Sequence, residues 1–187
     1  MKLEIVETPL AGVYVLKPRV FEDTRGFFFE SFKQDNLESA GIRERFVQDN
    51  QSRSLRNVLR GLHFQLQRPQ AKLCRVLSGQ VFDVAVDIRR GSPSFAQWFG
   101  IELTAENKLQ LYIPRGFAHG FSVRSESTDF FYKCSDYFDA ADDQGVLWND
   151  PEIGIAWDIR TPILSAKDQN RLPLSQLTVE ALPVYSP

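Results

Sequence analysis

The chain has 187 residues, 43% of them apolar, and a formal net charge of −2, which suits one globular domain spanning residues 1–187. Because the charge is so close to neutral, it gives no support for general attraction to nucleic acid or to an anionic membrane. The first residues lack the apolar stretch of a signal peptide, and no later run is long enough to cross a bilayer, so we expect a cytoplasmic protein.

Short strand-like segments follow one another along most of the chain. Residues 5–20 alternate loosely between proline and glycine breakers, which predicts short strands. Residues 33–40 are polar around Leu37 and end at Gly41, which predicts a short helix, and another is expected after Ser165. Further strands are predicted at 46–51, 58–66, 72–77, 81–88, 97–103, 109–113, 120–123, 129–137 and 155–159. This spacing is typical of an all-β sandwich or barrel.

The predicted strand 81–88 carries two carboxylates on one face. Alternation places Asp83 and Asp87 together, opposite a face formed by apolar side chains. Such a face lines either solvent or a polar cavity, and we expect solvent for at least one of the two aspartates.

The segment N-V-L-R-G-L-H-F-Q, residues 57–65, contains one of only two histidines. In a strand, Gly61, His63 and Gln65 share one face, and Leu62 and Phe64 lie on the other. The second face belongs in a core. A glycine beside an imidazole lets backbone or a ligand come close, so we expect a cavity around His63.

The second histidine, His119, follows a Pro-x-Gly turn in Y-I-P-R-G-F-A-H-G-F and is again next to a glycine. A lone histidine is more often structural, but two in glycine-flanked strands favour a site. Tyr132 lies in F-F-Y-K-C and is a candidate for the same site. The alternative is a structural tyrosine in the core with its hydroxyl hydrogen-bonded. Five cations could bind a phosphate or stabilise an oxyanion: Arg25, Arg60, Lys72, Arg115 and Lys167. Each of them taken alone is more often a charge on the protein surface.

Several chemistries are excluded by spacing. The chain has no G-x-G-x-x-G or Walker A loop, no G-x-S-x-G elbow and no H-E-x-x-H helix. Two histidines exclude a His-rich metal site; a mixed His/carboxylate site stays conceivable, but we expect no metal and no other cofactor. Cys74 and Cys134 lie in strand-like runs without metal-site spacing, which favours reduced thiols in the cytosol.

Ten segments taken together resemble the dTDP-4-dehydrorhamnose 3,5-epimerases, sugar-nucleotide enzymes of the cupin superfamily. They occur in family order between about residue 20 and residue 168: D-T-R-G-F-F-F-E, F-V-Q-D-N-Q-S, V-L-R-G-L-H-F-Q, P-Q-A-K-L, G-Q-V-F-D-V-A-V-D-I-R, G-S-P-S-F, Y-I-P-R-G-F-A-H-G-F, Y-K-C-S-D-Y, W-N-D-P and L-S-A-K-D. The resemblance implies a double-stranded β-helix (jelly roll) with short peripheral helices, working as a homodimer. The implied substrate is dTDP-4-dehydro-6-deoxyglucose, a dTDP-4-keto-6-deoxy sugar nucleotide, epimerised at C3 and C5 on the way to dTDP-rhamnose.

By the same resemblance, His63 is the base, Asp168 its partner and Tyr132 the general acid. Lys72 stabilises the enolate oxygen at C4. The implied substrate-binding residues are Arg60, His119, Gln48, Asp49, Asn50 and Lys167, with Arg25 and Glu30 reaching across the dimer and Asp143 at a position where the family often has glutamate. Ala96 replaces a frequent glycine.

The residues agree with this chemistry on their own terms. A hydrogen next to a ketone is acidic only if the enolate oxygen is stabilised, as by a fixed lysine, and an imidazole with a pKa of about 6.5 is a suitable base. Inversion needs a donor on the opposite face, and a phenol can serve. A single-centre epimerase (C3 or C5 alone), a non-catalytic sugar-nucleotide-binding cupin and a metal-dependent cupin oxygenase remain alternatives.

Overall fold

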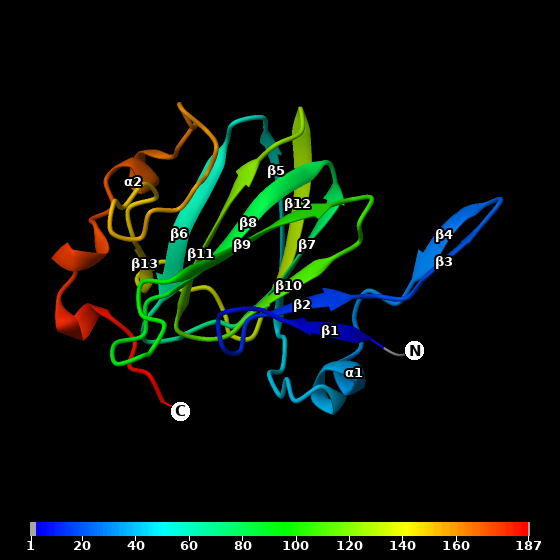
Figure 1. Cartoon of the computed structure of the whole chain (residues 1–187), viewed down its shortest axis with the longest axis horizontal. Coiled ribbons are helices and arrows are strands. Elements are labelled where there is room, and N and C mark those ends of the chain that lie inside the picture. Colours follow the sequence, from blue (N-terminus) through cyan, green and yellow to red (C-terminus); the bar gives the residue numbers. More distant parts are fainter. Residues whose placement is uncertain (1–2, 187) are drawn as a thin grey trace.

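A computed structural model describes residues 3–186 and contains two antiparallel sheets packed face to face as a jelly roll (Figure 1). The six-stranded sheet has the order β1 (Glu4–Glu7), β2 (Tyr14–Lys17), β10 (Gln110–Ile113), β7 (Lys72–Ser78), β12 (Ser127–Cys134) and β5 (Gln48–Leu55). The five-stranded sheet has the order β13 (Asp143–Gly145), β6 (Leu59–Gln65), β11 (Phe117–Val123), β8 (Gln80–Asp87) and β9 (Trp98–Thr104). The all-β prediction is confirmed.

Helices are short and peripheral. The predicted helix at 33–40 is α1 (Gln34–Ser39), and the one expected after Ser165 is α2 (Ala166–Gln169). Two 3₁₀ turns follow, η1 (Leu174–Gln176) and η2 (Val179–Ala181). No helix in the described part of the chain is long and apolar enough to span a membrane.

Two hydrophobic cores lie on the two faces of the five-stranded sheet. The core between the sheets includes Val81, Ala85 and Phe121 from this sheet and Phe130 from the other. The second core covers the outer face of the same sheet with residues from the last third of the chain, among them Trp157. Both faces of the five-stranded sheet are therefore shielded from solvent, and almost every residue of β8 and β11 is buried.

This double coverage overturns two predictions. Asp83 and Asp87 are both fully buried, so the expected solvent-facing aspartate does not exist. Asp87 is held by Arg89, at 2.7 Å between Oδ2 and Nη2, and by two serine hydroxyls. The predicted strand at 155–159 is also wrong, because this segment is irregular and only anchors Trp157 in the outer core.

One hairpin stands apart from the sheets. Strands β3 (Val20–Asp23) and β4 (Gly26–Phe29) pair only with each other and extend away from the body (Figure 1). Phe27 and Phe28 are 57% and 67% exposed. Apolar rings presented in this way are typical of a surface that meets another chain.

Candidate active site

A cavity of about 280 Å³ opens between the two sheets. Strands of both sheets supply its walls: the residues are Asn50, Gln51 and Ser52 from β5, Arg60 and His63 from β6, Lys72 from β7, His119, Gly120 and Phe121 from β11, and Tyr132 from β12. The cavity therefore collects both histidines, the lysine and the tyrosine that the sequence singled out.

The local geometry of β6 explains how two polar side chains of this strand line the cavity. His63 lies opposite His119 and Arg60 opposite Phe121, so the register shifts by one residue between these pairs. Such a bulge re-aims a side chain, and it brings Arg60 to the face of His63. A Cβ on Gly61, which has φ +116°, would lie 2.6 Å from the carbonyl oxygen of His119. The expected close approach is thus one of backbone to backbone.

His63 is held by a carboxylate 105 residues further along the chain. Its Nε2 donates to Oδ1 of Asp168 at 2.6 Å. Asp168 is almost fully buried on α2, and its own N–H donates to the hydroxyl of Ser165, the N-cap. Burial, the largest single influence, would raise the pKa of Asp168, but the hydrogen bond and charge of His63, together with the Ser165 hydrogen bond and the charge of Arg171, hold that pKa below its ordinary value. The dyad has the form of a base oriented by an ionised partner.

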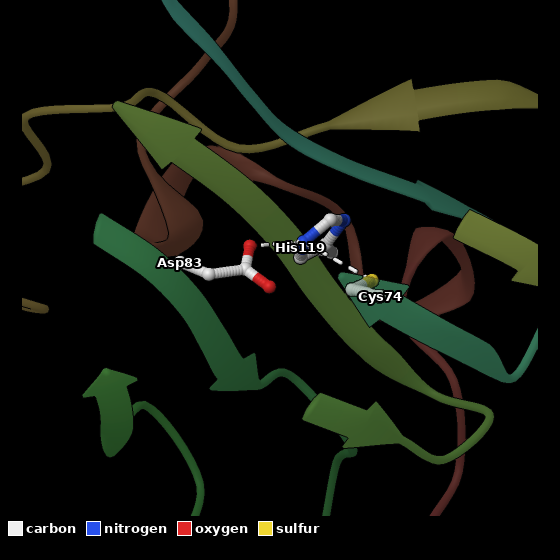
Figure 2. A group of neighbouring side chains, drawn as sticks. All are labelled: Cys74, Asp83 and His119. Carbon is white, nitrogen blue, oxygen red and sulfur yellow. Dashed lines mark hydrogen bonds and ion pairs between the residues drawn. The ribbon is translucent and has the colours of Figure 1, made fainter. Parts of the chain in front are cut away.

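His119 forms a second, more deeply buried pair. Its Nε2 donates to Oδ1 of Asp83 at 2.6 Å and lies 3.8 Å from Sγ of Cys74 (Figure 2). Burial lowers the pKa of His119 despite the charge and hydrogen bond of Asp83, so this imidazole is neutral near pH 7. Sequence reasoning did not assign Asp83 to the site, although its place beside Asp87 on one strand face left a polar cavity open.

Lys72 and Tyr132 lie side by side on one wall of the cavity, on the paired strands β7 and β12. Nζ of Lys72 lies 5.9 Å from the centre of the Tyr132 ring, and no carboxylate within residues 3–186 pairs with this ammonium. Burial raises the pKa of Tyr132, so its phenol stays protonated. An unpaired cation and a protonated phenol thus share the cavity with the His63 dyad.

Other predicted residues lie at the rim or elsewhere. Gln48 joins the rim, since its Nε2 donates to Oδ1 of Asn50 at 3.0 Å and its Oε1 accepts from the backbone N–H of Phe138 at 2.9 Å. Asp49 points to the opposite face of β5 and pairs with Lys133 at 2.8 Å. Arg115 pairs with Glu44.

The remaining predicted residues do not line the cavity of this one chain. Asp143 and Lys167 pair with each other beside α2. Arg25 and Glu30 belong to the projecting hairpin region, where Arg25 pairs with Asp23 and Glu30 accepts from Asn36. Sequence reasoning did not select the lining residues Gln51, Ser52 and Phe121; the alternation of β5 and β11 gives only a weak signal for them.

An oriented imidazole, a protonated phenol and an unpaired ammonium in one jelly-roll cavity define an enzyme of the cupin type that moves protons at a carbon next to a carbonyl. The sequence model of the dTDP-4-dehydrorhamnose 3,5-epimerases matches residues 7–176, and the chain belongs to this family.

Individual relatives agree. The chain is 55% identical over 162 residues to a dTDP-4-dehydrorhamnose 3,5-epimerase of Pseudomonas aeruginosa, covering 86% of this chain and 90% of that one. A crystal structure of the 3,5-epimerase of Legionella pneumophila, in complex with dTDP-4-keto-L-rhamnose, superposes with a TM-score of 0.97 at 47% identity and covers 99% of this chain and 100% of that one. A dTDP-4-dehydrorhamnose 3-epimerase of Streptomyces niveus is 37% identical over 180 residues, 95% of this chain and 87% of that one.

Proposed function

We propose that this protein is an isomerase that inverts C3 and C5 of dTDP-4-dehydro-6-deoxyglucose to give dTDP-4-dehydrorhamnose, a step of dTDP-rhamnose biosynthesis, with residues 1–187 acting as one domain. The observation that carries the proposal is the 2.6 Å contact of His63 with Asp168 in the cavity shared with Lys72 and Tyr132. The family of the chain agrees with it.

The first half of each inversion removes a proton from carbon. Because Nε2 of His63 donates to Asp168, the free lone pair of the ring is on Nδ1, which takes the proton from the carbon beside the C4 ketone. The electron pair of the broken C–H bond moves onto the C4 oxygen, where the ammonium of Lys72 offsets the negative charge. C3 and C5 both flank C4, so one lysine serves both centres.

The second half returns a proton from the opposite side. The phenol of Tyr132 donates to the carbon as the enolate collapses to the ketone, and the configuration is inverted. Tyr132 then recovers a proton from solvent, and the imidazolium of His63 releases one. The ionised carboxylate of Asp168 stabilises that imidazolium while it exists, which its lowered pKa allows at neutral pH.

The nucleotide end of the substrate needs cations and hydrogen-bonding groups at the rim. Arg60, whose Nε donates to Ser54 at 3.0 Å, suits bidentate capture of a phosphate. His119 and Asn50 contact the sugar. The other expected contacts to the nucleotide or sugar come from Gln48 and Lys167, and Asp143 pairs with Lys167. Asp49 faces away from the cavity and pairs with Lys133, so we leave it out of the binding site.

The working form in this proposal is a cytoplasmic homodimer. The projecting hairpin supports it, because exposed Phe27 and Phe28 need a partner surface and Arg25 is 88% exposed in its side chain. In the dimer, Arg25 and Glu30 of one protomer reach the cavity of the other. The unpaired thiols of Cys74 and Cys134 agree with a reducing compartment.

One other activity has specific support. The Streptomyces niveus relative is named as a 3-epimerase, so a single-centre reaction could use the same base and acid. A purely binding cupin would have no use for an intact base–acid pair, and here His63 and Tyr132 are both present.

The test is incubation of the protein with dTDP-4-dehydro-6-deoxyglucose in heavy water, followed by proton NMR. The proposal expects deuterium at C3 and C5 together with the rhamno-configured product. Deuterium at one centre only would establish the single-centre alternative, and an unchanged spectrum with saturable binding would establish a binding protein.

A further inference from the structure

Cys74, Asp83 and His119 form a buried group with the side-chain atoms that a metal site needs (Figure 2). The three side chains come from β7, β8 and β11, and their ligand atoms all lie within 4.8 Å of one another. Cys74 and Asp83 are fully buried, and His119 is 6% exposed. Figure 2 shows the polar ends of the three side chains pointing toward one another from strands of both sheets.

One polar atom of this group has no partner. Oδ1 of Asp83 accepts from His119, but Oδ2 is buried with no hydrogen bond from any described residue. A buried carboxylate oxygen without a donor is costly and is rare in folded proteins. The proton-transfer chemistry at His63 makes no use of this atom, nor of the thiol beside it. A cation held by Asp83, His119 and Cys74 would place a positive charge beside this carboxylate and would use the thiol as a ligand.

We propose that Cys74, Asp83 and His119 bind one thiophilic divalent cation, of which Zn²⁺ is the physiological example, and that its binding inhibits the enzyme. A thiolate, an imidazole and a carboxylate are the ligands that zinc takes, whereas Mg²⁺ and Ca²⁺ prefer oxygen. Bond lengths of about 2.0–2.3 Å at tetrahedral angles place nitrogen and sulfur ligands about 3.6 Å apart; Nε2 and Sγ are 3.8 Å apart already.

Binding exchanges protons for the metal ion. The thiol of Cys74 releases its proton to solvent, and the proton on Nε2 of His119 moves to Nδ1, which frees Nε2 as a ligand. Nε2 and Oδ1 of Asp83 then separate from 2.6 Å to about 3.3 Å. Two anionic ligands balance the charge of the dication, so the occupied site is neutral, which suits a buried position.

The location explains the inhibition. His119 lines the cavity and lies directly opposite His63 in the strand register, so their Cβ atoms are about 5 Å apart. A metal ion on His119, with its fourth position open to the cavity, takes up room for the sugar. It also turns the neutral imidazole of His119 into a metal ligand that no longer contacts substrate.

The experiment titrates metal-free protein with Cd²⁺, which reports a thiolate ligand by its ultraviolet charge-transfer absorption, and with Zn²⁺ in the activity assay. We expect one Cd²⁺ per chain, the absorption present in the wild type and Cys134→Ser and absent in Cys74→Ser, and a loss of turnover of at least tenfold at saturation that a chelator reverses. Cys134→Ser is the matched control because Cys134 is the other buried free thiol.

Several results would overturn the site: no saturable binding of one metal ion, an absorption that survives Cys74→Ser, or one that disappears in Cys134→Ser. Cadmium NMR of the wild type needs no variant, and a spectrum without a sulfur ligand would also reject it. Full turnover with the site saturated would reject the inhibition. Only the inhibition rests on the proposed function; if the keto-sugar is not converted at all, the absorption titration still decides whether the site exists.

Discussion

Replacing Asp168 with asparagine separates the charge of this residue from its shape. The variant keeps the volume and an acceptor oxygen 2.6 Å from Nε2 of His63, but the imidazolium loses its counter-charge. A hydrogen bond to a charged group contributes about 1.5–3 kcal/mol, against about 1 kcal/mol for a neutral one. The difference of about 0.5–2 kcal/mol is a factor of about 2 to 30. Because a rotated amide would also favour the wrong tautomer of His63, we expect kcat to fall further, by about 10- to 100-fold in all.

The assay is steady-state conversion of dTDP-4-dehydro-6-deoxyglucose at pH 7, with circular dichroism to check folding. Asp129→Asn is the matched control, because it removes a carboxylate that also makes a 2.6 Å ion pair, with Arg53, on the outer face of β12. That control should keep wild-type turnover. Folded Asp168→Asn protein that retains more than half of kcat would refute the role of the carboxylate.

The lowered pKa of Asp168 also fixes the sign of its effect on stability. A carboxyl group whose pKa is lower in the folded state stabilises that state above its unfolded pKa of about 3.9, and this contribution is lost as the pH falls through the lower, folded value. Asp168→Asn should therefore narrow the stability difference between pH 7 and pH 2 in urea unfolding; an unchanged difference would contradict the pairing.

Four further outcomes are expected. His63→Ala should lose about two to four orders of magnitude in rate while remaining folded, and near-normal turnover would reject His63 as the base. Tyr132→Phe should slow product formation more than the wash-in of solvent deuterium at C3 and C5; equal slowing, or none, would count against the phenol as donor. Dialysis against a chelator should not lower turnover, and a loss restored by one added metal would overturn the metal-free mechanism. Gly61→Ala should destabilise the fold by about 3 kcal/mol in urea unfolding, since its Cβ would lie 2.6 Å from Cα of Gly120; a wild-type midpoint would refute the close strand approach.

Local patterns predicted the strands well. Alternation and breakers located most strands to within a few residues, and the glycine beside His63 indicated the close contact that the structure contains. The mutual arrangement of His63, Lys72 and Tyr132 came from chemistry and from the family resemblance. The prediction of a strand at 155–159 was wrong. Its apolar residues alternate as in a strand, but they pack in the outer core without pairing to a neighbouring strand.

Long-range pairing lay beyond sequence patterns. Asp168 is 105 positions from His63, and only the resemblance connected them. The expectation that Asp83 or Asp87 faces solvent was wrong, because burial of their strand face depends on which distant strands pack against it. The same limit applies to Asp49: alternation separates it from Asn50, but which of the two faces the cavity depends on the opposing sheet.

The outer core has a consequence for how the protein becomes active during synthesis. The final third of the chain covers one whole face of the five-stranded sheet and carries Asp168 to His63. A nascent chain still lacking that third would display an uncovered apolar sheet, attractive to chaperones, and an imidazole with no counter-ion. Catalytic competence therefore arrives together with protection from aggregation, once Asp168 and the covering residues up to Leu182 have been synthesised.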